Sequence, residues 1–165
     1  MATIPNYPQR LLDEHFQWHS NMNMMNMRQG DGADFLRFHR DFMRRSLQWY
    51  NAQGLDRRSV AAWSSIPAEI RSHPMWNQGL QEAEDRITRN LASFRSSEEL
   101  GRFLLMSSLH DSVHVIGAEV YRDPDFGLIS LAPRSTLFYN WHGLIDRWWR
   151  DWQRISRRRR RTRNS

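Results

Sequence analysis

Six of the seven histidines in this chain fall into two sets with a similar spacing. The first set is His15, His19 and His39, and the second is His110, His114 and His142. Each set begins with two histidines four residues apart, which in a helix lie on one face, one turn from each other. A third imidazole from a neighbouring helix would complete a three-nitrogen metal site inside a helix bundle. The pattern therefore predicts a helical domain with two three-histidine sites.

The composition narrows what such sites can hold. The chain has no cysteine, which excludes disulfides, thiolate zinc sites, iron–sulfur clusters and a cysteine nucleophile. Ligation by imidazole alone suits copper or zinc better than magnesium, calcium or manganese. The Glu-x-x-His pairs of di-iron bundles do not occur. Two three-histidine sites that face each other would suit a dicopper centre that binds dioxygen between the ions.

The spacing of apolar residues predicts four main helices. The first helix covers residues 8–27, and the second follows a break at 28–32 and ends at Gly54. The third runs from an N-cap at Ser96 or Ser97 to Gly117, and the fourth begins at about Ser135. Another helix is predicted within residues 79–94, and a long connection within residues 55–77. We therefore predict an all-α four-helix bundle with long connecting loops.

The charge is unevenly distributed along the chain. The 165 residues suit one domain, which we assign to residues 1–156, followed by an arginine-rich tail at 157–165. All 24 basic residues are arginines, and the tail holds six of them, so the domain itself is neutral. A run of like charge predicts a disordered, solvated tail, although charge alone would also suit an anionic partner. Because no aromatic residue in the tail could stack on bases, we do not expect nucleic-acid binding.

The N-terminal residues and the hydropathy of the chain indicate where in the cell the protein is expected. The first residues contain no basic stretch followed by an apolar run, and no window approaches 18 uncharged apolar residues. The sequence thus predicts neither a secretory signal nor a membrane span. The cytoplasm is the expected location, although secretion that depends on a partner protein's signal would leave the same sequence.

Residues 109–114, Leu-His-Asp-Ser-Val-His, resemble the Leu-His-Asn-x-Val-His helix of the tyrosinase family, the type-3 copper oxidases related to hemocyanins and catechol oxidases. Residues 132–142 follow the family's Ser-Pro-x-Asp-Pro-x-Phe-Trp-x-His-His segment, and residues 145–153 follow its Ile-Asp-x-x-Trp-x-x-Trp-Gln end. This resemblance implies a tyrosinase- or hemocyanin-like dicopper fold. It also implies that the second set of histidines, His110, His114 and His142, binds the second copper ion.

On the first-copper side, residues 35–40 resemble the family's Phe-Leu-Pro-Trp-His-Arg segment, which implies His39 as a ligand. The family's middle ligand would lie nine residues earlier, where this chain has Gly30. Either His15 and His19 both bind, as in a hemocyanin-like arrangement, or one of them binds and the first site is incomplete. With both bound, the chain would hold two copper ions.

The chain departs from the family at three further places. Ser135 and Thr136 replace the family's Asp-Pro, and Trp141 replaces the first histidine of its His-His pair. Asp111 stands where the family has an asparagine that is thought to help hold a water that deprotonates monophenols. Asp111 is therefore either a catalytic base, a sign that only diphenol-like substrates are oxidised, or an acid on the helix surface.

Three functional hypotheses follow. The resemblance implies an oxidoreductase that uses dioxygen to oxidise a phenol, catechol or o-aminophenol to a quinone-type product. It also implies monooxygenase activity on phenols and a copper-delivery protein as a further partner. A non-catalytic copper and dioxygen carrier would need the same ligands. The third hypothesis is a zinc hydrolase, because residues 110–114 imitate the His-Glu-x-x-His motif with Asp in the position of the base.

A charged pair is predicted beside the histidines. Arg40 follows His39 directly, and Asp146 lies one helical turn after His142. Carboxylates close to metal ligands commonly bond to the groups around them. We expect Arg40 and Asp146 to form a buried pair that connects the two helices.

Overall fold

The computed structural model describes residues 3–163, and the regular elements in this part of the chain are helices, with one isolated β-bridge between Thr3 and Ser135. The longer helices are α1 (Gln9–Asn21), α2 (Asp31–Ala52), α4 (Gln78–Arg89), α5 (Ser97–Met106), α6 (Leu109–Val120) and α7 (Thr136–Arg163). The all-α prediction is confirmed. None of the helices described is both long enough and apolar enough to cross a lipid bilayer.

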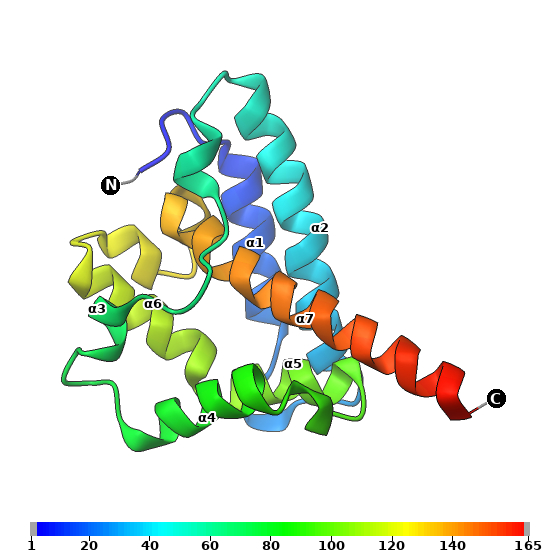
Figure 1. Ribbon diagram of the computed structural model, residues 1–165. Coiled ribbons are helices and arrows are strands. Elements are labelled where there is room, and N and C mark those ends of the chain that lie inside the picture. Colours follow the sequence, from blue (N-terminus) through cyan, green and yellow to red (C-terminus); the bar gives the residue numbers. More distant parts are fainter. Residues whose placement is uncertain (1–2, 164–165) are drawn as a thin grey trace.

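The helices that carry the histidines form the centre of the molecule. Helices α1 and α2 run antiparallel beside each other, and α7 crosses them (Figure 1). Helix α6 packs against α7, and α5 packs against both α2 and α6. The connection before α4 holds the 3-10 helix η2 (Arg57–Val60) and the short helix α3 (Ala68–Arg71), and the connection before α7 holds η4 (Pro124–Gly127) and η5 (Ala132–Arg134).

Helices α2 and α5 cross at a pair of glycines. A Cβ atom added to Gly101 would lie 1.9 Å from the carbonyl oxygen of Gly32, and one added to Gly32 would lie 2.3 Å from the carbonyl oxygen of Glu98. Both distances are far below van der Waals contact. The two backbones can approach this closely only because neither residue has a side chain.

The third predicted helix has the expected position, but it is two helices instead of one. Its N-cap is Ser96, whose Oγ accepts a hydrogen bond from the backbone N–H of Glu99 at 3.1 Å. The helix does not run on to Gly117, because Ser108 has a φ of 62° and the chain turns there. The result is two helices, α5 and α6, with α6 free to aim its histidines at the centre.

The first predicted helix ends earlier than expected. Met22 is already extended, so α1 stops at Asn21 instead of continuing to residue 27. The side chain of Asn23 accepts hydrogen bonds from the backbone N–H groups of Met25 and Asn26, which starts the 3-10 helix η1 (Met24–Asn26). This local capping by asparagine competes with the helical ladder.

The prediction of a disordered tail is wrong for residues 157–163, which continue α7 without a break. Arg159 Nη1 donates to the carbonyl of Ala92 at 2.6 Å, so the end of α7 is attached to the 3-10 helix η3 (Leu91–Ser93). Residues 164 and 165 lie outside the described part of the chain. The boundary proposed at residue 156 stays a prediction.

The expected charged pair between α2 and α7 is present, but it is partly exposed instead of buried, with 34% of the Arg40 side chain and 17% of the Asp146 side chain accessible. Arg40 Nε donates to Asp146 Oδ1 at 2.5 Å. The Arg40 guanidinium also lies 3.6 Å from the ring centre of Trp149, a close cation–π contact. Three side chains thus connect the helices that carry His39 and His142.

Candidate metal centre

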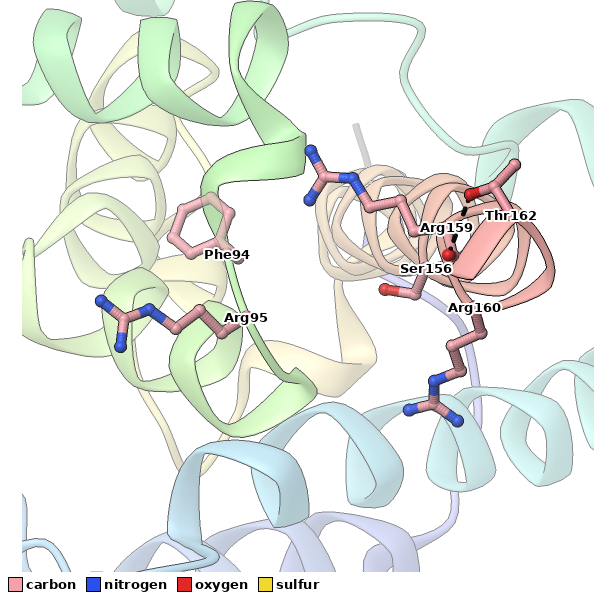
Figure 2. Close-up of a pocket in the computed structure, with 6 residues that line it drawn as sticks. All are labelled: Phe94, Arg95, Ser156, Arg159, Arg160 and Thr162. Carbon is pink, nitrogen blue, oxygen red and sulfur yellow. Dashed lines mark hydrogen bonds between the residues drawn. The ribbon is translucent and has the colours of Figure 1, made fainter. Parts of the chain in front are cut away.

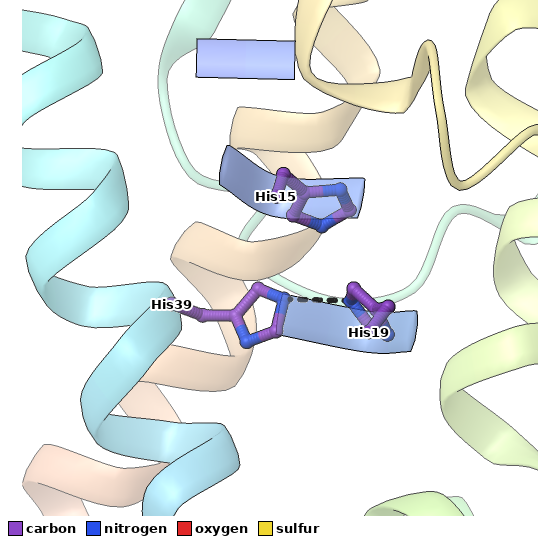
Figure 3. A group of neighbouring side chains, drawn as sticks. All are labelled: His15, His19 and His39. Atoms are coloured by element: carbon purple, nitrogen blue, oxygen red, sulfur yellow. Dashed lines mark hydrogen bonds between the residues drawn. The ribbon is translucent and has the colours of Figure 1, made fainter. Parts of the chain in front are cut away.

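The first cluster consists of His15 and His19 on α1 and His39 on α2. Helical spacing places His15 and His19 one turn apart, and α2 brings His39 to the same face (Figure 3). One ring nitrogen of each residue lies within 4.8 Å of those of the other two. His19 Nε2 and His39 Nε2 are 3.3 Å apart. Three imidazoles therefore converge although residue 30 is a glycine.

The second cluster consists of His110 and His114 on α6 and His142 on α7. It repeats the geometry of the first cluster, since its ring nitrogens also lie within 4.8 Å of one another. His110 Nε2 and His142 Nε2 are 3.1 Å apart. All six predicted metal-binding histidines thus fall into two groups of three.

The two clusters face each other. The rings of His39 and His142 are parallel to within 7°, with centres 4.7 Å apart. The rings of His19 and His110 are also nearly parallel, with centres 6.3 Å apart. The clusters therefore share one boundary, and ions held in them would be neighbours.

Nδ1 hydrogen bonds fix the orientation of five of the six rings. The Nδ1–H groups of His15, His39, His114 and His142 donate to the carbonyls of Ile129, Phe35, Phe126 and Phe138 at 3.0, 2.8, 2.7 and 2.9 Å respectively. His110 Nδ1 donates to Asp111 Oδ1 at 2.7 Å. A metal-binding histidine usually makes this kind of hydrogen bond, because it fixes the tautomer and leaves Nε2 free for the ion.

The free nitrogens are left without donors. A neutral imidazole has one N–H, and in His39 and His142 it is used at Nδ1, so each Nε2 presents a lone pair toward the other histidines of its cluster. Such a lone pair is what a metal cation binds. His15 Nε2 is also buried and has no hydrogen-bond partner among the described residues. The donor set therefore fits a metal ion in each cluster.

Burial keeps five of the six imidazoles neutral. Loss of solvation, followed by the proximity of other histidines, lowers the pKa of His19 and of His114 to about 3. The same two causes lower the pKa of His15, His39 and His142 well below the usual histidine value. At neutral pH these nitrogens are ready to bind a metal without first losing a proton.

The loop between α6 and α7 supplies two of the carbonyls. Ser135 Oγ donates to Asp123 Oδ2 at 2.6 Å, and the Arg134 guanidinium donates to both oxygens of Asp125. These bonds hold the segment that aims the carbonyls of Phe126 and Ile129 at the histidines. Sequence reasoning did not identify these groups, because every residue has a carbonyl and only the fold decides where it points.

A cavity of about 200 Å³ opens over both clusters. Two histidines of each cluster line it, namely His15, His19, His110 and His114. Most of the remaining wall is apolar and includes Val115, Phe126, Ile129 and Ala132, of which Val115 and Ile129 are exposed at the mouth. His39 and His142 are buried and are not part of the lining. A small molecule can therefore approach both clusters from one side.

Asp111 lines the same cavity, with its side chain 67% exposed. The hydrogen bond from His110 lowers the pKa of Asp111. One carboxylate oxygen is thus already bound to a ring nitrogen. The lowered pKa makes Asp111 a weaker base than the hydrolase hypothesis would want.

The other departures from the family pattern have structural explanations. Ser135 Oγ accepts from the backbone N–H of Leu137 at 3.1 Å and so caps the start of α7, a role that Asp performs equally well. Trp141 is fully buried and packs edge-on against Trp148, with ring centres 5.6 Å apart. It belongs to neither histidine cluster.

The sequence model of the family described as the common central domain of tyrosinase matches residues 44–155. The match covers about two thirds of the chain, so the chain belongs to the tyrosinase family. It includes all of the second cluster and begins after His39, so the argument for the first cluster rests on the geometry described above. Neither the curated proteins nor the solved structures contain a match to the chain.

Proposed function

We propose that this protein is a type-3 copper oxidase that uses dioxygen to oxidise a catechol, phenol or o-aminophenol to a quinone-type product. One observation carries the proposal: two three-histidine clusters face each other beneath a small cavity. Family membership supports copper as the metal, and the all-imidazole donor set is chemically suited to it.

His15, His19 and His39 would hold one copper ion, and His110, His114 and His142 would hold the other. Bound copper would supply the sites for dioxygen and would accept electrons from the substrate. The protein keeps His15, His19, His39, His114 and His142 neutral, fixes five of the six rings through Nδ1, and excludes water from His39 and His142. In the overall reaction two catechols lose four electrons and four protons, and one dioxygen becomes two waters.

The cavity supports a substrate with a single aromatic ring. Its volume of about 200 Å³ lies below the range of roughly 300–1,000 Å³ that is usual for drug-sized ligands. Phe126 and Ile129 offer an apolar surface to such a ring, while Asp111 is the one acidic residue that the described part of the chain contributes to the lining. The hydroxyl groups would then face the histidines and the ring would face the apolar wall.

We propose that Asp111 is a positioning residue for His110 and that oxidation of diphenols exceeds hydroxylation of monophenols. The bond from His110 Nδ1 occupies one oxygen of the carboxylate and lowers the pKa of Asp111, which makes Asp111 a weaker base toward a monophenol. A diphenol already carries the two hydroxyl groups that its oxidation needs. This argument favours the second of the interpretations that the sequence left open for Asp111.

The test is turnover by the copper-loaded protein. Catechol in aerated buffer should give o-quinone, which is detected by its absorbance. One dioxygen should be consumed for every two catechols oxidised. His114→Gln should abolish turnover. His73→Gln is the matched control, since His73 lies outside both clusters and contacts Glu119 at 3.2 Å. Copper-loaded protein that binds dioxygen but oxidises no catechol would instead be a carrier, and the oxidase proposal would fail.

A further inference from the structure

The C-terminal part of α7 carries a concentration of positive charge that the metal centre does not use. Residues 154–163 contain seven arginines and no acidic residue. This part of α7 extends past the other helices of the molecule (Figure 1). Arg157, Arg158 and Arg160 are exposed, and none of the three has an acidic partner in the described part of the chain.

A further arginine borders a cleft beside this helix, although its guanidinium is directed away from α7 (Figure 2). The cleft has a volume of about 700 Å³, and its lining includes Arg159 and Arg160 from α7 and Arg95 from the segment before α5 (Figure 2). An adjoining cleft of about 290 Å³ is lined by Arg95, Arg157 and Arg160 together with serine hydroxyls. Neither lining includes Asp or Glu among the described residues.

The acidic groups closest in sequence are already paired. Glu99 accepts from the backbone N–H of Arg95 and from the Arg86 guanidinium. Asp151 pairs with Arg154 at 3.2 Å. Arginines three and four residues apart on one helix repel each other, and residues 154–161 contain several such pairs. A bound polyanion would relieve this repulsion.

We propose that the arginine-rich end of α7, together with Arg95, binds the phosphate backbone of a nucleic-acid duplex. An α-helix with its side chains is roughly 10–12 Å wide, which matches the major groove of B-DNA at about 12 Å. At about 100° per residue, Arg157, Arg158 and Arg160 spread over a wide arc of the helix surface. Cations spread in this way can reach the phosphates of both strands that flank a groove.

Other anionic partners fit the same surface less well. Insertion at a membrane surface needs an apolar helix face, and Ile155 is the only apolar residue in 154–163. A single strand is usually held by exposed aromatic residues that stack on its bases. Residues 154–163 contain none, and Phe94 and Trp152, which line the two clefts, are buried. An acidic peptide lying along one side of α7 would leave some of the arginines Arg157, Arg158 and Arg160 without an anionic partner. The expectation from sequence of no nucleic-acid binding rested on the lack of stacking aromatic residues, which a single strand needs and the phosphate backbone of a duplex does not.

The test is binding of the full chain to a labelled DNA duplex of random sequence, and to the matching RNA duplex, measured by fluorescence anisotropy over a range of salt concentrations. The triple variant R157Q/R158Q/R160Q should bind at least about tenfold more weakly, and its salt dependence should become shallower by about 0.9 for each phosphate that the variant no longer neutralises. Glutamine is a good helix former, so α7 should persist, which circular dichroism would check.

The control variant R10Q/R37Q/R89Q has the same net charge but replaces exposed arginines on other helices. It should bind the duplex within about twofold of the unmodified chain. Equal losses in the two variants would mean that net charge alone is responsible, and would overturn the proposal. So would stronger competition by the single strand, by phosphatidylserine vesicles or by polyglutamate than by unlabelled duplex. Copper content should be the same in both variants, which keeps this test separate from the proposed oxidase activity.

Discussion

At the residue scale, the hydrogen bond at each Nδ1 decides what the opposite nitrogen can do. Four of the acceptors are backbone carbonyls, which have no alternative protonation state. The fifth is the carboxylate of Asp111, which adds a negative charge beside His110. A charged acceptor makes the imidazole a stronger ligand than a carbonyl does. The second cluster is therefore more sensitive to one side chain than the first.

Replacement of Asp111 separates orientation from charge. In Asp111→Ala, His110 loses its Nδ1 acceptor, and we expect the affinity of the second cluster for copper to fall by about 10–100-fold. Asp111→Asn keeps an acceptor oxygen and should lose much less. Competition with a copper chelator would measure both. Equal losses in the two variants would contradict a positioning role that an amide can fulfil.

The histidines themselves were predictable from the sequence, because helical spacing alone places residues four apart on one face. Gly30 left the completeness of the first site open, and the structure resolves the geometric question by bringing both His15 and His19 to His39. The acceptors at Phe126 and Ile129 were not predictable. They depend on how the loop before α7 folds, which involves contacts such as that between Asp123 and Ser135.

At the element scale, the position of α2 depends on its crossing with α5. The crossing joins the helix that carries His39 to the helix that leads into α6. It has two components, a backbone contact at Gly32 and Gly101 and a side-chain contact from Glu98 Oε2 to the backbone N–H of Ala33 at 2.9 Å. A carboxylate at the first turn of a helix also interacts favourably with the helix dipole.

Substitution at the glycine contact should be strongly destabilising. In Gly101→Ala the new methyl group would meet the backbone of Gly32, which cannot move aside as a flexible side chain could. We expect the free energy of unfolding to fall by about 3 kcal/mol or more, at the upper end for overpacking. Urea denaturation would measure it. Gly79→Ala is the control, since a side-chain oxygen at 3.3 Å is its closest neighbour, and its effect should stay within about 1 kcal/mol.

The Glu98 contact should give stability a pH dependence. Burial raises the pKa of Glu98, but the bonds from Ala33 and Arg102 outweigh it, and the net shift is downward. As the pH falls, Glu98 is therefore protonated in the unfolded chain before it is protonated in the folded chain. The stabilisation is present above the ordinary glutamate pKa of about 4.3 and is lost as the pH falls through the lower folded value.

Glu98→Gln should accordingly lower the free energy of unfolding by about 1 kcal/mol at pH 7, and the difference from the unmodified chain should shrink toward pH 3. Denaturant titrations at the two pH values would measure it. Glu82→Gln, at an exposed position on α4, should change neither value appreciably. A Glu98→Gln deficit of the same size at both pH values would show that charge is not responsible.

Helix positions could be predicted better than helix ends. Apolar spacing located α2 and the N-cap of α5, because those signals are local. The break at Ser108 was missed, since a positive φ at a serine has no sequence signal of its own. The helical state of residues 157–163 was also missed, because a run of like charges predicts disorder. The hydrogen bond from Arg159 to Ala92 joins residues far apart in the sequence, so sequence patterns do not reveal it.

At the scale of the whole molecule, two pairs of helices each deliver one cluster to a shared boundary. Helices α1 and α2 supply the first, and α6 and α7 supply the second. Arg40 and Asp146 link the two pairs next to the histidines. The long connections remain outside this centre, except where the loop before α7 forms the wall of the cavity. The fold therefore concentrates the six clustered histidines in its core and leaves one face open.

The central claim is that the six histidines form two separate copper sites. The most direct test is the copper content per chain after loading, measured by elemental mass spectrometry on the unmodified protein and on single variants. We predict two copper ions for the unmodified chain and for His73→Gln, and one each for His19→Gln and His114→Gln. A single copper ion in the unmodified chain, or loss of both ions in either cluster variant, would contradict two independent sites.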